Sequence, residues 1–418
     1  MYGANVNVYT KEGLIEPELI EVKTSPPSKM CRQEGELRIY AANTVLPSGV
    51  FPAVVEISNG KIVSIDAGAG VDANLADLKI DSGYLSAGLI DLQINGAYGT
   101  DFMAANSSDW DRILTQLPES GVTAIYPTVI TAPVTDLVNW FNSNRFQVKT
   151  YSDRTAVLGF HLEGPFLSMK RKGAHRAECV IAPTDEAIES LISAAQDSLK
   201  IVTIAPEIEN ATSAIKRLVA HGVKVSVGHS DATADQVALA GDLGATLITH
   251  LFNAQSPVSH RDTGVAGQAL IDERFTLGLI VDLHHVVAQS VLLAFKAAQS
   301  RVCLVTDAIS ALGMPAGDYE LAGESVSVKA GQPPVRSDGT LAGSAIRLDH
   351  AISNCIKIGV SPGIAIAAAT KVPAQAMGLS DRGTIEVGNR ADLVWLNYSN
   401  DVLETERTWI AGNEVFAK

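Results

Sequence analysis

The chain has 418 residues, which is long for one ordinary domain and suits a large barrel with a small second domain. Its residues are 46% hydrophobic and 19% charged, so a sizeable core is expected and wholesale disorder is excluded. The formal net charge of −14 argues against a nucleic-acid or anionic-membrane partner, although a small phosphorylated ligand needs only a local pocket.

The cysteines and the chain start point to a cytoplasmic protein. Cys31, Cys179, Cys303 and Cys355 form no CxxC pair, and we interpret them as free thiols of a reducing compartment. The N-terminal stretch lacks a basic region followed by an apolar one, so no secretory signal is expected. No apolar run reaches the about 18 residues that a membrane span needs. We expect a soluble protein without membrane or nucleic-acid partners.

Both ends of the chain have β-rich patterns. Residues 1–35 are expected to form an arm that is disordered or held to a surface. Residues 36–83 contain short apolar runs broken by turns, and the Asn59-Gly60 pair predicts a hairpin. Residues 381–418 return to β-like runs at 383–388, 391–396 and 408–415. We predict that residues 36–83 and 381–418 together build one small β-sandwich domain.

Between them, residues 84–380 alternate short apolar strands with amphipathic helices. The expected strands are 85–93, 122–128, 156–163, 201–205, 223–228, 245–249, 276–282 and 302–306. The expected helices are 109–119, 185–195, 211–220, 235–242 and 286–298, with two more near 345–358 and 362–377 after a polar, glycine-rich segment at 311–341. This rhythm predicts a (β/α)8 TIM-like barrel. An open doubly wound sheet is the rival, but no glycine-rich dinucleotide fingerprint follows the first strand.

Polar side chains stand where the predicted barrel strands end, which is where barrel enzymes place their chemistry. A lone histidine there is more often a hydrogen-bonded loop residue than a ligand, and a lone carboxylate is more often a helix cap. Their coincidence at one barrel mouth indicates a divalent metal, because buried charges are costly unless paired. The residues are Gln93, Asn95, His161, Glu163, His229, His250, His284, His285 and Asp307; Thr128 and Glu207 end the other strands less informatively.

Glu163, His229 and His250 are the ligands that we predict. One carboxylate and two imidazoles suit Zn²⁺ or Fe²⁺ and leave a position for water, whose pKa the metal lowers towards about 7. Asp307 is the natural general base for that water and later the acid for the leaving group. His161 shares a strand face with Glu163; it could be a ligand, but we favour a role in supporting one.

Six motifs, in chain order, are similar to those of the amidohydrolase superfamily and, within it, the N-acetylglucosamine-6-phosphate deacetylase family. They are GLIDLQING (88–96), HLEGPF (161–166), GHS (228–230), THLFNA (249–254), VTDA (305–308) and LAGS (341–344). The resemblance covers about residues 40–415. It implies hydrolysis of the acetamide of N-acetyl-D-glucosamine 6-phosphate to D-glucosamine 6-phosphate and acetate, in amino-sugar catabolism. It also implies one divalent metal per subunit, with Zn²⁺ expected and Fe²⁺, Co²⁺ or Mn²⁺ as alternatives.

The same resemblance implies roles for residues outside the predicted ligand set. Ala174 and His175 would contact the sugar and the acetamide, His175 also stabilising the developing oxyanion. The main chain of Asn253 and Ala254 would bind the phosphate. Leu341, Ala342 and Gly343 would form a loop that closes over the substrate. His285 would contact the substrate, with His284 as the possible substitute. Arg261 of the neighbouring subunit would contact the phosphate, which implies a homodimer.

The chain departs from many amidohydrolases at the end of the first barrel strand. Gln93 and Asn95 stand where those enzymes have His-x-His, and neither is a strong ligand for Zn²⁺ or Fe²⁺, so a single-metal site is expected. The alternatives are another amidohydrolase-type reaction, such as cyclic-amide hydrolysis or deamination, and a catalytically inactive barrel that serves as a scaffold.

Overall fold

The structure is a computed structural model that describes residues 36–418, so the predicted arm at 1–35 lies outside the described residues. The described residues form one compact unit, and the domain boundaries near residues 84 and 380 stay a prediction. No helix between residues 36 and 418 is long and apolar enough to cross a membrane.

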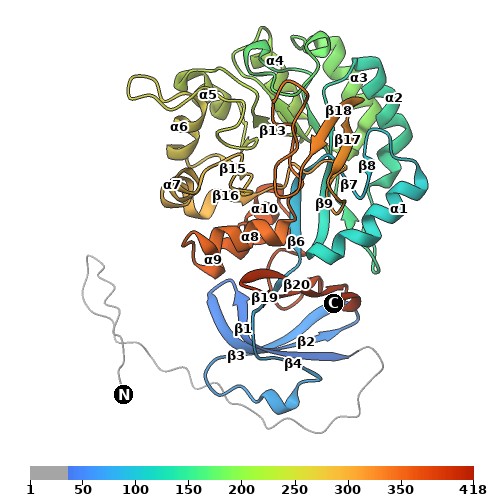
Figure 1. The fold of residues 1–418 in the computed structure, drawn as a ribbon, viewed down its shortest axis with the longest axis vertical. Coiled ribbons are helices and arrows are strands. Elements are labelled where there is room, and N and C mark those ends of the chain that lie inside the picture. The colour runs from blue at the N-terminus through green and yellow to red at the C-terminus, as the bar shows by residue number, and fades with distance from the viewer. Residues whose placement is uncertain (1–35) are drawn as a thin grey trace. The chain divides into compact units, whose positions relative to one another are not determined.

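Strands from both chain ends form one 8-stranded sheet in the order β21-β20-β19-β5-β1-β2-β3, with β4 paired to β1. The first strands (blue) and the last (red) lie side by side in Figure 1, joined by antiparallel pairing of β5 with β19. This confirms that the small β-domain is built from both chain ends. The strands are β1 (Leu37–Leu46), β2 (Gly49–Ser58), β3 (Lys61–Ala67), β4 (Leu78–Ile80), β5 (Tyr84–Ala87), β19 (Leu393–Ser399), β20 (Val402–Ile410) and β21 (Asn413–Ala417).

Local sequence signals in this sheet were right in one place and wrong in another. Asn59 and Gly60 form the turn between β2 and β3, both with left-handed backbone (φ 50° and 76°). The strand predicted at 383–388 is wrong. Its alternating apolar residues resemble a strand, but the Asn389 N–H bonds back to the Glu386 carbonyl in a turn. The apolar Ile385 still enters the sheet core.

The barrel prediction is confirmed by a second sheet of parallel strands. Its order is β10-β9-β11-β12-β13-β14-β15-β16, with β6 also paired to β9. A parallel bridge between Ile94 and Ala308 and a 2.8 Å hydrogen bond from the Asp307 N–H to the Gln93 carbonyl bring the first and last strands together. The strands are β6 (Leu89–Ile94), β9 (Val122–Ile130), β10 (Ala156–Val157), β11 (Phe160–Glu163), β12 (Leu199–Ile204), β13 (Lys224–Val227), β14 (Leu247–Ile248), β15 (Thr276–Leu279) and β16 (Val302–Leu304).

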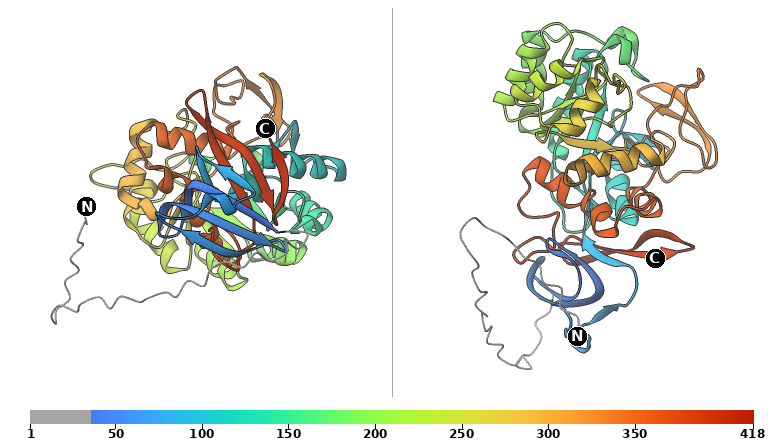
Figure 2. Two further views of the ribbon diagram at one scale, coloured as in Figure 1. Left: turned by 90° about the horizontal axis from the view of Figure 1, so that it is seen from below. Right: turned by 90° about the vertical axis from the view of Figure 1, so that its left-hand side faces the viewer.

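Helices surround these strands in Figures 1 and 2, and most lie where the amphipathic pattern predicted them. They are α1 (Ser107–Gln116), α2 (Val134–Asn144), α3 (Asp185–Ala195), α4 (Ala211–Ala220), α5 (Ala234–Asp242), α6 (Gly264–Ile271), α7 (Ala288–Ala298), α8 (Leu348–Lys357), α9 (Pro362–Ala367) and α10 (Lys371–Met377). Helices α2 and α6 were not predicted. The single helix predicted at 362–377 is two helices, because Pro373 lacks an N–H and is placed in the first turn of α10 instead of a helix interior.

The glycine-rich segment after β16 contains an antiparallel hairpin of β17 (Gly317–Leu321) and β18 (Glu324–Val328), drawn in orange in Figures 1 and 2. Leu321 and Val326 pack on Ile130 and Ile309 at the carboxyl ends of β9 and β16. The hairpin is also fixed by a 2.8 Å hydrogen bond from the Ala322 N–H to the Asp101 carboxylate. It therefore lies over the edge of the barrel mouth.

Candidate active site

A cavity of about 390 Å³ opens at the carboxyl ends of the barrel strands. Residues from seven strand ends and from the following loops line it, as the strand-end rule predicts. The lining residues include Asn95, Glu163, Ala174, His175, His229, His250, Asn253, Ala254, His285, Asp307, Leu341 and Gly343.

Glu163, His229 and His250 form the compact cluster at the floor of this cavity. The His250 Nε2 atom lies 3.0 Å from Glu163 Oε1 and 3.1 Å from His229 Nε2, and His229 Nε2 lies 3.3 Å from Glu163 Oε1. All three side chains are buried. Among the described residues this is the group of His, Cys, Asp and Glu side chains that could hold a metal ion.

The orientation of the two imidazoles fits a cation. His229 Nδ1 faces the Arg171 carbonyl at 2.9 Å, so Nδ1 carries the proton and Nε2 presents its lone pair to the cluster. His250 Nδ1 is buried and has no hydrogen-bond partner within residues 36–418, which leaves Nε2 as the atom in contact with the cluster. Ligand atoms about 2.0–2.1 Å from a tetrahedral zinc lie roughly 3.3 Å from each other, close to the separations observed. Converging lone pairs at this spacing repel each other unless a cation lies between them.

The electrostatics of the cluster favour an ionised carboxylate. Burial would raise the pKa of Glu163, but the contacts with His229 and His250 outweigh it and hold that pKa well below its usual range. For His250, burial lowers the pKa and the Glu163 carboxylate raises it, with a net raised value. Glu163 is therefore ionised in this cluster, and a bound cation would compete with the proton that its carboxylate favours on His250.

Asp307 lies beside the cluster and is held by the two amides that replace His-x-His. Asn95 Nδ2 donates to Asp307 Oδ1 at 2.7 Å, and Gln93 Nε2 donates both to that oxygen at 3.2 Å and to Glu163 Oε1 at 3.0 Å. No hydrogen bond is found for the other Asp307 oxygen among the described residues. Burial, with the nearby Glu163 charge, raises the pKa of Asp307 to about 6. Gln93 and Asn95 thus bind the carboxylates of Glu163 and Asp307 at the end of the first barrel strand.

Three of these side chains leave their strands through left-handed backbone. The φ angles are 47° at His229, 28° at His250 and 48° at Asp307. Residues other than glycine adopt this region at a cost of about 1–3 kcal/mol each, and such strain clusters at functional sites.

His175 lies against the cluster and is oriented by a residue that the sequence did not single out. Its Nδ1 is 2.8 Å from the Thr131 hydroxyl, which itself donates to the Glu163 carbonyl at 3.2 Å. Burial, with the nearby His229, lowers the pKa of His175 to about 3, so the ring is neutral. Strand β9 continues past the expected Thr128 to Ile130, and this places Thr131 in the site.

Glu207 is a second residue whose role the sequence did not reveal. It follows β12, and its carboxylate accepts the Ser230 hydroxyl at 2.7 Å and the Asp231 N–H at 2.6 Å. The Ser230 N–H in turn donates to the Ala254 carbonyl at 3.1 Å. Glu207 therefore fixes the loop after His229 to the segment predicted to bind phosphate. A carboxylate directly after a barrel strand was the signal available.

Other predicted residues divide between the cavity and the surface. His285 lines the cavity with Nδ1 on the Asp282 carboxylate at 2.7 Å, whereas His284 is exposed. Ala342 is fully buried under the hairpin and does not line the cavity, unlike its neighbours in the predicted closing loop. Arg261 is exposed and does not line the cavity of its own chain.

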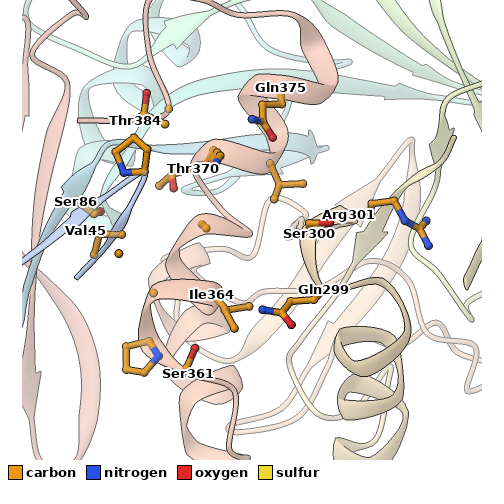
Figure 3. A pocket seen from close by; sticks show the side chains of 18 of the residues that line it. Val45, Ser86, Gln299, Ser300, Arg301, Ser361, Ile364, Thr370, Gln375 and Thr384 are labelled. Atoms are coloured by element: carbon orange, nitrogen blue, oxygen red, sulfur yellow. The ribbon is translucent and has the colours of Figure 1, made fainter. Parts of the chain in front are cut away.

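A larger cavity, of about 1640 Å³, lies at the opposite end of the barrel strands (Figure 3). Val45 and Ser86 come from the terminal sheet, and Ser361 and Gln375 come from the last helices. Its guanidinium, Arg301, already donates to four backbone carbonyls after and within α6: those of Ala269, Leu270, Asp272 and Phe275. The Arg301 side chain is therefore committed to holding the backbone of this segment.

A model of the amidohydrolase family matches residues 84–415. The chain belongs to this family. Among relatives of this amidohydrolase is N-acetylglucosamine-6-phosphate deacetylase from Danio rerio, 33% identical over 376 residues that cover 87% of this chain and 92% of the relative. Another is N-acetylgalactosamine-6-phosphate deacetylase from Escherichia coli O157:H7, 34% identical over 334 residues that cover 79% and 88%.

The amidohydrolase also resembles a solved structure that contains a phosphorylated amino sugar. It is an aspartate-to-alanine mutant of N-acetyl-D-glucosamine-6-phosphate deacetylase from Mycobacterium smegmatis in complex with N-acetyl-D-glucosamine-6-phosphate. The TM-score is 0.85 at 31% identity, over 92% of this chain and 100% of the other. The fold of the amidohydrolase is therefore shared along nearly its whole length with that deacetylase.

Proposed function

We propose that this amidohydrolase removes the acetyl group of N-acetylglucosamine 6-phosphate, giving glucosamine 6-phosphate and acetate. The observation that carries the proposal is the buried cluster of Glu163, His229 and His250 beside Asp307, in a cavity bordered by the Asn253-Ala254 main chain. The deacetylases to which the chain is similar supply the substrate class. The free Cys179, Cys303 and Cys355 suit a cytoplasmic location.

Glu163, His229 and His250 would hold one divalent cation, for which we favour Zn²⁺. When bound, that cation supplies Lewis acidity, polarising the amide carbonyl and making water a stronger acid. We do not assign Gln93 and Asn95 as metal ligands, because their amides already donate hydrogen bonds to Glu163 and Asp307.

Asp307 carries the proton transfers in this proposal. The oxygen left free by Asn95 and Gln93 takes a proton from the attacking water and later gives it to the departing amine nitrogen. Its pKa of about 6 leaves it mostly ionised at neutral pH, as a base requires, and makes it a stronger base than an ordinary aspartate.

His175 would orient the substrate. A neutral ring that donates through Nδ1 to Thr131 presents Nε2 as an acceptor, which suits a sugar hydroxyl or the amide N–H. In that tautomer Nε2 cannot donate to an oxyanion, so we assign His175 to substrate orientation and not to oxyanion stabilisation.

The phosphate would be held from two chains. Asn253 and Ala254 line the cavity, and the exposed Arg261 lies on the following loop, eleven residues beyond His250. We propose that Arg261 of one subunit reaches the phosphate in its neighbour, so that the homodimer is the active form. A guanidinium matches a phosphate through paired hydrogen bonds.

A second candidate substrate is N-acetylgalactosamine 6-phosphate, which the similarity to the Escherichia coli enzyme favours. The two sugars differ only in the configuration at C4. The chemistry at the acetamide is the same for both, so the choice depends on contacts at the sugar ring.

The test is acetate release by the purified chain, with metal analysis, on both sugar phosphates and on unphosphorylated N-acetylglucosamine. We expect one divalent ion per subunit and activity on the glucosamine derivative that requires the phosphate. Activity on cyclic amides or aminopurines alone would favour another amidohydrolase reaction. A chain that binds metal but hydrolyses none of these compounds would favour the scaffold alternative.

A further inference from the structure

A chain of buried hydrogen bonds lies in the barrel interior, directly below the metal-ligand cluster. His161 Nε2 is 2.7 Å from the Thr203 hydroxyl, which is 2.7 Å from the Thr249 hydroxyl, which is 2.6 Å from the Ser226 hydroxyl. All four side chains are buried. We name His161, Thr203, Thr249 and Ser226 the core hydroxyl chain.

The core hydroxyl chain joins the strands that carry the predicted ligands. His161 stands two residues before Glu163 on β11, and Ser226 stands on β13, which ends just before His229. Thr249 is the residue next to His250 and bonds to both Thr203 and Ser226. A shift of one strand end against another would therefore break a hydrogen bond in this chain.

The direction of the hydrogen bonds follows from the one partner that cannot donate. His161 Nδ1 faces the Leu92 carbonyl at 3.1 Å, so Nδ1 carries the ring proton and a neutral ring accepts at Nε2. Thr203 then donates to His161, Thr249 donates to Thr203, and Ser226 donates to Thr249. Every hydroxyl proton is committed within the core hydroxyl chain, and none is spent on Glu163.

The backbone is shaped to allow these contacts. A Cβ added at Gly228 would lie 2.6 Å from Thr249 Cβ and 2.9 Å from Thr203 Cγ2, so only glycine fits there. Gly228 is also the residue before His229. The glycine that precedes one ligand thus permits the threonine that precedes another to reach its partners.

We propose that the core hydroxyl chain positions the metal ligands, with Thr249 as its central positioning residue. Thr249 does not line the active-site cavity; it sets where His250 and His229 stand relative to Glu163. Outer hydrogen-bond partners of metal sites act in this way. The proposal rests on the metal site of the proposed function, and its test is a metal-binding measurement made without substrate.

The experiment compares Thr249→Val, which keeps the shape and removes the hydroxyl, with Thr249→Ser, which keeps the hydroxyl. Thr246→Val is the matched control, because the Thr246 hydroxyl lies on the same segment, is buried and has no hydrogen-bond partner in the described part of the chain. The full-length chain is stripped of metal, and Zn²⁺ binding is titrated against a chromophoric chelator. The visible spectrum of the Co²⁺ form reports ligand geometry.

We expect Thr249→Val to raise the Kd for Zn²⁺ by about 10–100-fold and to change the Co²⁺ spectrum. Thr249→Ser and Thr246→Val should both remain close to the parent chain. A lower Tm for Thr249→Val with unchanged Kd would overturn the proposal, as would equal weakening by Thr249→Val and Thr249→Ser. Should Thr249→Val fail to fold, Ser226→Ala takes its place, and an unchanged Kd in that variant overturns the proposal.

The outcomes also separate this inference from the function on which it rests. A parent chain that binds no Zn²⁺ would overturn both the metal site and the positioning role. A parent chain that binds Zn²⁺ tightly but hydrolyses no sugar phosphate would contradict the proposed substrate and leave the Thr249 comparison decisive.

Discussion

Replacement of Asp307 by asparagine tests the proposed proton transfers most directly. Asn95 and Gln93 both donate to one Asp307 oxygen, so an asparagine can keep its amide oxygen there and place its NH₂ where the free oxygen was. The shape and the hydrogen bonds are retained, and the ability to accept a proton is lost. We therefore expect the Asp307→Asn variant to fold and to bind metal.

The expected loss of kcat is about 10²–10⁴-fold, the usual contribution of general acid–base catalysis, or about 2.7–5.4 kcal/mol of barrier. The pH dependence of the rate gives an independent test of this role. Asp307 acts as a base when ionised, so the parent rate falls as the pH drops through its pKa, which burial raises to about 6. A bound cation would move this midpoint below 6. The residual rate of the variant should lack that acidic limb.

The assay measures acetate release against pH, with metal content determined on the same samples. The control is Asp136→Asn, an exposed aspartate in the first turn of α2, which should leave the profile unchanged. A variant with the parental kcat, or one that retains the acidic limb at the parental midpoint, would refute Asp307 as the base. Loss of metal from Asp307→Asn would instead assign this residue to metal binding.

Three further predictions test other parts of the structure. In steady-state kinetics, Arg261→Ala should raise KM for the phosphorylated sugar by about 10–150-fold with a smaller effect on kcat, because a hydrogen bond to a charged group contributes about 1.5–3 kcal/mol. An unchanged KM would show that Arg261 does not contact the phosphate. Removing metal with a chelator should lower the Tm, because a ligand at 100 times its Kd stabilises the folded chain by about 2.7 kcal/mol; a Tm that does not respond to added Zn²⁺ would contradict the site. Asp349→Ala should lower the free energy of unfolding by about 3–5 kcal/mol in denaturant titrations, because this fully buried carboxylate accepts hydrogen bonds from Arg347 and from the Thr405 N–H and hydroxyl. The Zn²⁺ affinity should not change. A loss below about 1 kcal/mol would contradict the stabilising role of this pairing.

The sequence predicted those features that depend on strand position alone. Parallel strands bring their carboxyl ends to one face, so Glu163, His229, His250 and Asp307 could be grouped before their distances were known. The Asn59-Gly60 turn was similarly predictable, because few residue pairs adopt two successive left-handed conformations.

Features that depend on side-chain contacts were out of reach. Thr131 and Glu207 orient the site through hydrogen bonds to residues 44 and 23 to 24 positions away, and nothing in the local sequence shows where such bonds go. Helix α6 escaped notice because GVAGQALI is buried on nearly every side and lacks the polar face that marks an amphipathic helix. The strand predicted at 383–388 shows the reverse error: its residues alternate as in a strand, but the segment ends in the Glu386–Asn389 turn, where the Gly388 N–H bonds to the Ile62 carbonyl of β3.

The left-handed backbone at His229, His250 and Asp307 bears on how this barrel tolerates mutation. Glycine occupies that conformation without the steric cost of a Cβ atom, so a change such as His229→Gly would remove a ligand and relax the backbone at that position. Folding alone would therefore favour loss of the site. At these three positions a substitution that stabilises the fold would therefore remove a residue of the proposed site, so stability and the proposed chemistry are opposed there.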